Sequence, residues 1–578
     1  MILSAASGFS LSTGPLMILR QQRHHRQLVS NSQLNLDGEG MAGRTFNKHL
    51  LGDIIRALQP SYLSQLQKSV AGNLKGMQTL DLGPFLSYQN QSTANCVSWE
   101  ELANTLRQQQ TSQEKNFRSN LGQGLIHSPL ATHRKFNRSS FDDAAVFVSF
   151  FRDSAAWCPY CQKVYMTLEE KQIPYKVVKV DMNSYAGTSK PGDFLQIQPS
   201  GSLPCAIIHR EGTKDQVIQQ SDDILVAIDA LENNSNIKIA SLFPKSETEK
   251  EYMKFLCDDG RNSLERRLYA EWLWYLTGKR RPDEYRQRFE TILDEVDSTL
   301  SSTPGSFFLK DFSMADIKFI PFVERQAASL LYFKGFNLRN TSRWPHIVNW
   351  LEAMEKRTSY LMTKSDVYTH SRALPAQLSA GCEFYEGCEE MRDAVDSYCL
   401  PTSATSTPDS GTTWREPGWD HYHNNIQASK REAAERIIFN HDNICKFAAR
   451  ASGLPGFPAA AAQLADPKAQ PNEDALVAVD SFLKCTIGLL LARNDAQKKE
   501  RLHLATESGR ALSKGGEETV QATIDCLDYL RQRIGVPRDM SYPAAQSLRE
   551  ALLVISEMLM QSKLELRENQ EKLNSNIS

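Results

Sequence analysis

The sequence predicts an α/β domain followed by all-α regions. Residues 144–234 alternate short apolar strands with helical segments, whereas residues 246–380 show helical periodicity only. A stretch rich in Pro, Ser, Thr and Gly at 400–425 predicts a linker before a further helical domain at 426–578. Because 578 residues exceed what one hydrophobic core holds, we expect about three folded units.

The charge and the cysteine content narrow the class of protein. The 66 basic and 68 acidic side chains give a formal net charge of −2, so the charge does not favour nucleic acid or an acidic membrane as the main partner. The apolar run at 485–492 is far shorter than the ~20 residues that cross a bilayer. Eleven cysteines, odd in number and irregularly spaced, argue against a disulfide framework and fit a reducing compartment.

Residues 1–40 have the composition of a targeting leader. The first 36 residues lack Asp and Glu, are rich in Ser, Gln and His, and carry Arg20, Arg23 and Arg26. This composition is typical of an organelle transit peptide, and a disordered basic tail is the alternative. In the N-terminal extension at 41–143, Ser98 and Glu101 predict one capped helix.

The α/β domain at 144–234 has a distinct order of elements. The apolar strand "AVFVSFF" leads to a helix that begins at the motif CPYC, with Cys158 and Cys161, and the strand "YKVVKV" comes next. After a loop come the strand "SLPCAII", a turn, the short strand "QVIQ" and the helix "SDDILVAIDAL". The predicted order is therefore β-α-β followed by β-β-α.

The two helical regions show a strong helix start and a bundle pattern. Ser313 can accept a hydrogen bond from the backbone of Asp316, whose carboxylate can return one, so a buried helix is expected to begin here. In the C-terminal domain two helices joined by the turn "IGVPRDMSYP" carry apolar residues at spacings of three and four. These residues are Val520, Ile524, Leu527 and Ile534, and Leu548, Leu552, Ile555 and Leu559.

The two cysteines of the CPYC motif predict redox chemistry. A thiolate is the nucleophile in thiol exchange, and a cysteine at a helix N-terminus has its anion stabilised by unpaired N–H groups and by the helix dipole. Cys158 is predicted to occupy that place. Cys161 lies one turn deeper and could resolve a mixed disulfide, and Pro159 suits the first helical turn because it has no N–H to leave unpaired.

Two other interpretations of the motif are weaker. A zinc site needs four ligands, and no second CxxC or paired His occurs at a usable spacing. Two inert core thiols are the other alternative. Against it, Pro204 follows Cys161 by 43 residues at the start of a strand. In a thioredoxin-like sheet such a proline is commonly cis, which leaves the backbone N–H and C=O of the preceding residue, here Leu203, free to pair with a bound peptide.

With these motifs in place, residues 145–375 resemble a cytosolic-type glutathione transferase, in which a thioredoxin-like domain precedes an all-helical domain. The cap at Ser313 and Asp316 matches a folding signature of that family. A cysteine at the catalytic position, in place of serine or tyrosine, is similar to the omega, lambda and dehydroascorbate reductase classes. The resemblance implies thiol transfer rather than conjugation.

The same resemblance implies which residues bind glutathione. Cys158 matches the cysteine that forms a mixed disulfide with glutathione, and Lys190 matches the lysine that meets the glycine carboxylate. Leu203 and Pro204 match the backbone clamp on the cysteinyl part.

The γ-glutamyl end of glutathione is expected at the start of the last helix of the α/β domain. Gln220 and Ser221 match the acid and serine that hold this end in the family. Because the acid is Gln here, the charge assistance to the glutathione ammonium is lost. Asp222 is expected either to compensate in part or to cap its helix.

The motif, the two extensions and the leader together resemble the iota class of photosynthetic organisms, and so does the tail "RIGVPRDMSYPAAQSLREAL". This resemblance implies the plastid (chloroplast) stroma as the location if residues 1–40 are a transit peptide, and the cytosol otherwise. The C-terminal domain is expected to hold a ligand or a partner, with a flavin or another flat aromatic molecule as one candidate.

Further candidate residues lie in the helical domain. Cys382 and Cys388 could form a regulatory disulfide. Trp272, Trp274 and Tyr275 could line an apolar acceptor pocket, although core packing is the commoner role of aromatics at this spacing.

Two functions of different classes follow. The first is a glutathione-dependent thiol transferase and deglutathionylase, with dehydroascorbate reduction by the same chemistry, that works through a Cys158–glutathione mixed disulfide. The second is a ligand-binding or scaffold protein that retains the fold without catalysis. A homodimer is compatible with either, and no metal, nucleic acid or membrane span is expected.

Overall fold

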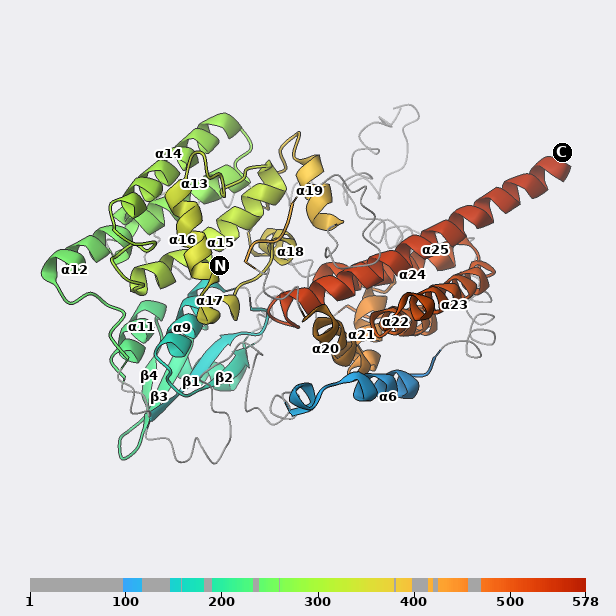
Figure 1. The fold of residues 1–578 in the computed structure, drawn as a ribbon, viewed down its shortest axis with the longest axis horizontal. Coiled ribbons are helices and arrows are strands. Elements are labelled where there is room, and N and C mark those ends of the chain that lie inside the picture. Colours follow the sequence, from blue (N-terminus) through green and yellow to red (C-terminus); the bar gives the residue numbers. More distant parts are fainter. Residues whose placement is uncertain are drawn as a thin grey trace, which may run out of the picture. The chain divides into compact units, whose positions relative to one another are not determined.

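The structure is a computed structural model (Figure 1). The described residues are 97–116, 146–156, 158–180, 190–231, 239–258, 260–378, 381–397, 414–418, 425–455 and 469–577. The predicted leader, most of the N-terminal extension and most of the linker at 400–425 lie outside the described residues. Within the described part, no helix is both long and apolar enough to span a membrane.

The α/β domain contains a four-stranded mixed sheet with the strand order β2-β1-β3-β4. β1 and β2 are parallel, whereas β1–β3 and β3–β4 are antiparallel, as the predicted β-α-β and β-β-α order requires. A short helix, α10, lies where the sequence predicted a loop. In chain order the elements are β1 (Val146–Asp153), α9 (Pro159–Glu170), β2 (Tyr175–Val180), α10 (Gly192–Ile197), β3 (Cys205–Arg210), β4 (Gln216–Ile218) and α11 (Ser221–Asp229).

Alternation along the strands fills both faces of this sheet. Val148 and Phe150 of β1 belong to the main core, together with residues of α9 and α11. Phe151 of β1 packs on the opposite face with Val180 and with Phe194 of α10. The sheet is therefore covered on both faces, and the end of β1 leads into α9 from a rigid support.

A second, all-helical domain follows. Its helices are α12 (Glu247–Met253), α13 (Leu264–Thr277), α14 (Pro282–Ser301), α15 (Met314–Lys334), α16 (Pro345–Glu355), α17 (Thr358–Leu361), α18 (Val367–Gln377) and α19 (Glu389–Asp396), with a π-helical turn at Lys254–Asp258 and a 3₁₀ turn at Gly260–Asn262. α15 begins with the predicted capping box, in which the Asp316 carboxylate accepts from Ser313 N at 2.8 Å. That carboxylate also accepts from Trp350 Nε1 at 2.9 Å.

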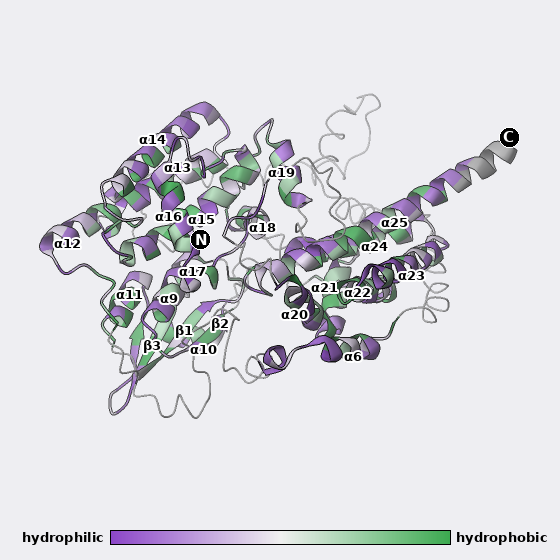
Figure 2. Cartoon of the chain, in the orientation of Figure 1, coloured by the Kyte–Doolittle hydropathy of each residue, from purple (hydrophilic) through white to green (hydrophobic). Residues whose placement is uncertain are grey.

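The C-terminal helices form a separate core. They are α20 (Ile426–Ile438), α21 (His441–Ala448), α22 (Leu476–Leu490), α23 (Asp495–Ser513), α24 (Glu517–Arg533) and α25 (Tyr542–Ile577), with 3₁₀ turns at Ala449–Ser452 and Glu473–Ala475. All eight apolar positions predicted on the last two helices are buried in this core. Figure 2 shows hydrophobic and hydrophilic stretches alternating along these helices, as expected when one face of each helix is buried.

One helix of the N-terminal extension also belongs to that core. α6 (Trp99–Gln109) starts with the predicted capping box of Ser98 and Glu101. Its Leu102 and Leu106 are buried among the C-terminal helices, and Trp99 Nε1 donates to Asp480 of α22 at 2.7 Å. Segments that lie more than 300 residues apart in the chain therefore build one core.

Buried polar contacts join the C-terminal core to the second domain. Arg549 of α25 forms an ion pair with Asp366, and both side chains are only 1% exposed. Arg549 Nη2 also donates to Thr369 at 2.9 Å and to the Ile534 carbonyl at 2.7 Å. The start of α25 is thus held against the start of α18.

Candidate active site

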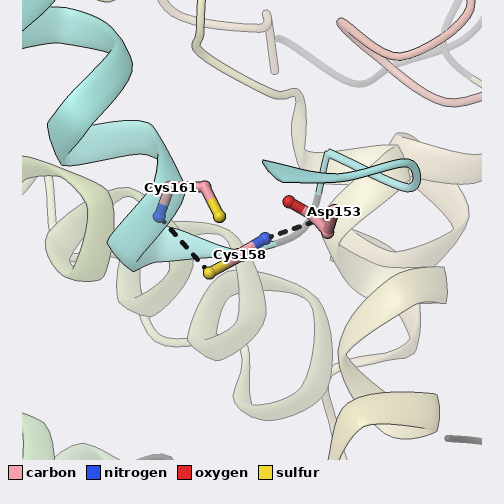
Figure 3. A group of neighbouring side chains, drawn as sticks. All are labelled: Asp153, Cys158 and Cys161. Atoms are coloured by element: carbon pink, nitrogen blue, oxygen red, sulfur yellow. Dashed lines mark hydrogen bonds between the residues drawn. The ribbon is translucent and has the colours of Figure 1, made fainter. Parts of the chain in front are cut away.

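The junction between β1 and α9 carries the CPYC motif. β1 ends at Asp153, and α9 begins at Pro159, so Cys158 is the N-cap residue of the helix. Its sulfur accepts a hydrogen bond from Cys161 N at 3.3 Å (Figure 3). Cys158 lies where the sequence predicted it, with its sulfur at the unpaired N–H groups of a helix start.

The two cysteines of the motif differ in accessibility. Both are free thiols; Cys158 is half-buried and Cys161 is buried. Burial, followed by the hydrogen bond and the charge of Cys158, raises the pKa of the Cys161 thiol well above its usual value. Of the two cysteines of the motif, Cys158 is the one that has access to solvent and lies at the helix N-terminus.

The residue pair predicted to clamp a peptide lies next to the first sulfur. The Leu203–Pro204 peptide bond is cis, as predicted, and β3 begins at the next residue. The Cys158 thiol donates to the Leu203 carbonyl oxygen at a distance of 3.8 Å. The structure therefore brings Leu203 and Pro204 to the cysteine from a different segment of the chain.

Lys190 also lies close to this site. Burial lowers the pKa of its ammonium, while the charges of Cys161, Cys158 and Asp153 act in the opposite direction. Its Nζ is 5.8 Å from the ring centroid of Phe194 in α10. Lys190 thus supplies a positive charge within electrostatic range of both sulfurs.

Gln220 and Ser221 lie at the start of α11. Gln220 is exposed and is the N-cap residue, although its side chain makes no capping hydrogen bond. Ser221 is half-buried and is the first helical residue. No described contact joins Gln220 or Ser221 to the cysteines. Their role in binding glutathione therefore stays a prediction.

Asp222 does not cap α11, which corrects one expectation. Its carboxylate forms ion pairs with Lys163 of α9 at 3.0 Å and with Lys318 of α15 at 3.6 Å. The Lys163 ammonium is the main cause that lowers the pKa of the Asp222 carboxyl. Asp222 links three helices and is already paired with two cations.

Asp153 belongs to the site and was missed at the sequence level. It is 1% exposed, and its Oδ2 accepts from Cys158 N at 3.4 Å. One ligand atom each from Asp153, Cys158 and Cys161 lies within 4.8 Å of the others, which is a spacing that suits a metal ion. A tetrahedral structural zinc site needs a fourth protein ligand. The signal available in the sequence was an acidic residue at the end of a strand, five residues before the first cysteine.

Comparison with known proteins shows which families the described domains match. Residues 157–231 match the model for the glutathione S-transferase N-terminal domain, and residues 265–353 match the model for the C-terminal domain of the same family. These two segments of the chain are therefore similar to the two domains of a glutathione S-transferase.

Curated relatives cover the same region. Glutathione S-transferase L1 of Arabidopsis thaliana is 25% identical over 212 residues, which are 36% of this chain and 79% of that protein. The chloroplastic glutathione S-transferase DHAR3 of the same plant is 24% identical over 218 residues, or 36% of this chain and 69% of that protein.

Solved structures match at lower identity. Dehydroascorbate reductase of Chlamydomonas reinhardtii is 19% identical, with 38% of this chain and 92% of that chain covered and a TM-score of 0.28. Glutathione transferase Omega 3C of Trametes versicolor is 22% identical, with 42% and 98% covered and a TM-score of 0.32.

The C-terminal transferase domain contributes an aromatic cluster beside the motif. Arg266 of α13 donates to the hydroxyl of Tyr160, the third residue of CPYC, at 3.2 Å. Its guanidinium also lies over the rings of Tyr160, Tyr269 and Phe322, at 5.7, 5.7 and 5.1 Å from their centroids. Phe322 of this domain packs on Tyr160, with ring centroids 5.5 Å apart, and neither Phe322 nor Tyr269 was singled out from the sequence.

Core packing, the commoner role named for the aromatics of α13, is confirmed for Trp272 and Tyr275. Trp272 and Tyr275 are buried in the main core, and Trp272 Nε1 donates to Ser329 at 2.9 Å, whereas Trp274 is 54% exposed. Trp272 and Tyr275 are three positions apart and therefore lie on the same face of α13, which packs against the core.

The predicted disulfide between Cys382 and Cys388 is not formed. Both are free thiols, and Cys388 donates to the Tyr385 carbonyl at 2.9 Å. Burial raises the pKa of Cys382 to about 12, so this thiol is held in its unreactive protonated form.

Proposed function

We propose that this protein is a cysteine-type glutathione transferase, similar to the iota class, that performs thiol transfer and deglutathionylation through Cys158. The observation that carries the proposal is the place of the Cys158 sulfur, which accepts the Cys161 N–H at the start of α9 and faces the Leu203 carbonyl. The glutathione transferase domains and the relatives named DHAR support a glutathione-dependent activity.

The proposed first half-reaction forms the mixed disulfide. The Cys158 thiolate attacks the glutathione sulfur of a glutathionylated protein or of glutathione disulfide. The old S–S bond breaks, the partner leaves as a thiolate that takes up a proton, and a Cys158–glutathione disulfide remains. No oxidant is needed, because one disulfide replaces another.

The second half-reaction has two routes. The thiolate of a second glutathione attacks the mixed disulfide, which releases glutathione disulfide and regenerates the Cys158 thiolate. Alternatively, Cys161 attacks, which releases glutathione and leaves a Cys158–Cys161 disulfide. Because the raised pKa of Cys161 keeps it protonated at neutral pH, the route through a second glutathione is favoured. Reduction of dehydroascorbate would likewise consume two molecules of glutathione and produce one glutathione disulfide.

The proposed glutathione site extends from α10 to α11. The backbone of Leu203, before the cis Pro204, pairs with the cysteinyl part, and Lys190 binds the glycine carboxylate. Ser221 and the unpaired N–H groups at the start of α11 donate hydrogen bonds to the γ-glutamyl carboxylate. Gln220 offers a neutral acceptor to the ammonium, so we expect weaker binding than a carboxylate at this position would give.

Intact-mass measurement tests the proposal. The purified full chain is incubated with glutathione disulfide, and one glutathione adduct is expected on the wild type and on Cys161→Ser. Cys158→Ser should remain unmodified under the same conditions. An unmodified wild-type protein would contradict the proposal.

A binding or scaffold role is the second candidate, and one observation favours it. The buried Arg549–Asp366 ion pair holds the C-terminal helices against the transferase domain. Catalysis at Cys158 does not require this contact. The absence of a Cys158 adduct in the mass measurement, together with a folded chain, would select this role.

Three further predictions remain open. A flavin or another aromatic ligand on the C-terminal helices is checked by the visible absorbance of the purified protein. Plastid location is checked by fusing residues 1–40 to a fluorescent protein. A homodimer is checked by sedimentation of the full chain.

A further inference from the structure

Two basic residues face each other at the strand ends that lead to Cys158. Arg152 of β1 and Lys179 of β2 are register partners in the parallel pair, so their side chains point to the same face of the sheet. Like charges on directly opposed strand positions destabilise a sheet. The next residue after Arg152 is Asp153, whose carboxylate accepts from Cys158 N.

The two cations differ in their partners. Arg152 lies over the ring of Tyr165, 5.4 Å from its centroid, and its Nη2 is 4.0 Å from Asp153 Oδ1. Lys179 is exposed, and among the residues that the structure describes it has no hydrogen bond and no ion pair. Lys179 is therefore an exposed cation of the sheet that no ion pair among the described residues neutralises.

The C-terminal helical region brings two more cations to the same place. Burial is the largest cause that lowers the pKa of the Lys179 ammonium, and the charges of Arg152, Arg436 and Arg538 lower it further, against the opposing effect of Asp539. Arg436 belongs to α20, and Arg538 belongs to the turn between α24 and α25.

The charge of Asp153 also acts on Arg538. Its Nε and Nη2 donate to Asp539 at 2.9 and 2.7 Å. Burial lowers the pKa of Arg538, but the carboxylates of Asp539 and then Asp153 raise it by more. The turn that carries Arg538 therefore lies within electrostatic range of the acid that contacts the Cys158 backbone.

The turn is held in position from two sides. Ser541, at its end, donates from N to Glu432 of α20 at 2.9 Å. Ser365 of the transferase domain donates to the Val536 carbonyl at 2.6 Å. The cations of the C-terminal region are thus placed by fixed contacts.

The group of Arg152, Lys179, Arg436 and Arg538 is here called the cationic cluster, and the carboxylates that act on Lys179 and Arg538 are those of Asp539 and Asp153. Asp153, which accepts from Cys158 N at 3.4 Å, directly follows Arg152 in β1, so the cluster begins at the strand end next to Cys158. An extended peptide rises about 3.3 Å per residue, so a side chain one to three positions from a cysteine held at Cys158 reaches it.

We infer that the cationic cluster binds the carboxylates of an acidic peptide segment, so that the protein acts by preference on glutathionylated cysteines flanked by Asp or Glu. This inference rests on the proposed thiol transfer at Cys158 and names its substrate class. Lys190 and the start of α11 serve the carboxylates of glutathione itself, whereas the cluster serves the protein half of the disulfide.

The test compares two glutathionylated peptides that differ only in their flanks, one with two Asp residues and one with two Lys residues. At low ionic strength kcat/KM for the acidic peptide should exceed that for the basic one by about fivefold or more. This ratio should approach one in 1 M salt, where charges are screened beyond about 3 Å. In Lys179→Glu the ratio should fall by about three- to fivefold or more.

A matched control lies on the same strand. Lys176 of β2 is exposed, pairs in register with Ser149, and points to the opposite face from Lys179. Lys176→Glu makes the same change in net charge and should leave the ratio within a factor of about 1.5. Lys176→Glu should keep the wild-type thermal midpoint, and Lys179→Glu should not lower it, since it removes a like charge opposite Arg152.

The outcomes separate this inference from the proposed function. Turnover of both peptides at equal rates, or an equal effect of the two lysine variants, overturns the inference and leaves thiol transfer intact. If neither peptide yields a Cys158–glutathione adduct, the proposed function fails, and the inference fails with it.

Discussion

Cys158 of the transferase region and the cysteines inside the C-terminal helices lie in opposite surroundings. Cys158 caps a helix at the end of a strand and is half-buried. Cys526 lies in the middle of α24 at 0% exposure, where burial raises its pKa to about 11. Burial also raises the pKa of Cys445 in α21. The position of a thiol at a helix start, and not its presence in the chain, is what suits it to redox chemistry.

Removing each kind of thiol is the strongest test of this comparison. Cys158→Ser should lower kcat/KM for a glutathionylated peptide by at least about a hundredfold, because a serine hydroxyl is neither ionised nor exchangeable with a disulfide. Cys526→Ser, measured in parallel, should keep the wild-type rate. A large loss in the Cys526 variant with its fold intact would show that the C-terminal region takes part in the chemistry.

The contact between the two regions is expected to have the next largest effect. In Arg549→Met the Asp366 carboxylate is left buried without its partner, which should lower the free energy of unfolding by about 3–5 kcal/mol. Urea denaturation followed by circular dichroism measures this change. The exposed pair of Arg510 and Glu507, 2.8 Å apart, is the control, and Arg510→Ala should cost less than about 1 kcal/mol.

The buried cap of α15 predicts a pH dependence. Burial raises the pKa of Asp316 to about 6, although hydrogen bonds from Ser313, Phe308 and Trp350 act to lower it. In the unfolded chain this carboxyl loses its proton near pH 4, whereas the folded protein keeps the proton up to about pH 6. The contribution of Asp316 to the free energy of unfolding should therefore fall by about 3 kcal/mol as the pH rises from about 4 to about 6.

Urea unfolding at several pH values measures that slope. Asp316→Asn removes the titration, so the difference between wild type and variant should change across this interval and stay constant above it. A difference that does not change with pH would place the pKa of Asp316 near its value in the unfolded chain.

The smallest effect is expected within the CPYC motif. Because Cys161 is buried and protonated, Cys161→Ser should change the turnover of a glutathionylated peptide by less than about threefold when glutathione is in excess. Brief treatment with iodoacetamide should modify Cys158 before Cys161, which peptide mapping would show. A loss of turnover in Cys161→Ser would instead favour the dithiol route.

Local patterns predicted much of the transferase region. The helix starts at Cys158 and Ser313, the cis bond before Pro204 and the apolar positions of the last two helices follow from neighbouring residues, because capping, turn geometry and helical periodicity act over a few positions. α10 was missed because a helix of six residues is too short to show a period.

Contacts between distant segments could not be predicted in this way. Arg266 lies more than 100 positions from Tyr160, and the register that pairs Arg152 with Lys179 depends on how β1 and β2 align in space. Which aromatic residue of α13 would stay exposed could not be predicted for the same reason, since the composition of a helix does not say which neighbour covers each face.

The packing of α6 has a consequence for how the chain matures during synthesis. This helix emerges from the ribosome before the transferase domains. Its apolar side can be buried only after α20 and α22 have been made, more than 300 residues later. The transferase domains can therefore fold while the surface of α6 is still exposed, and only the last quarter of translation closes it. A chain whose translation stops early would carry a helix with exposed apolar side chains, to which chaperones bind.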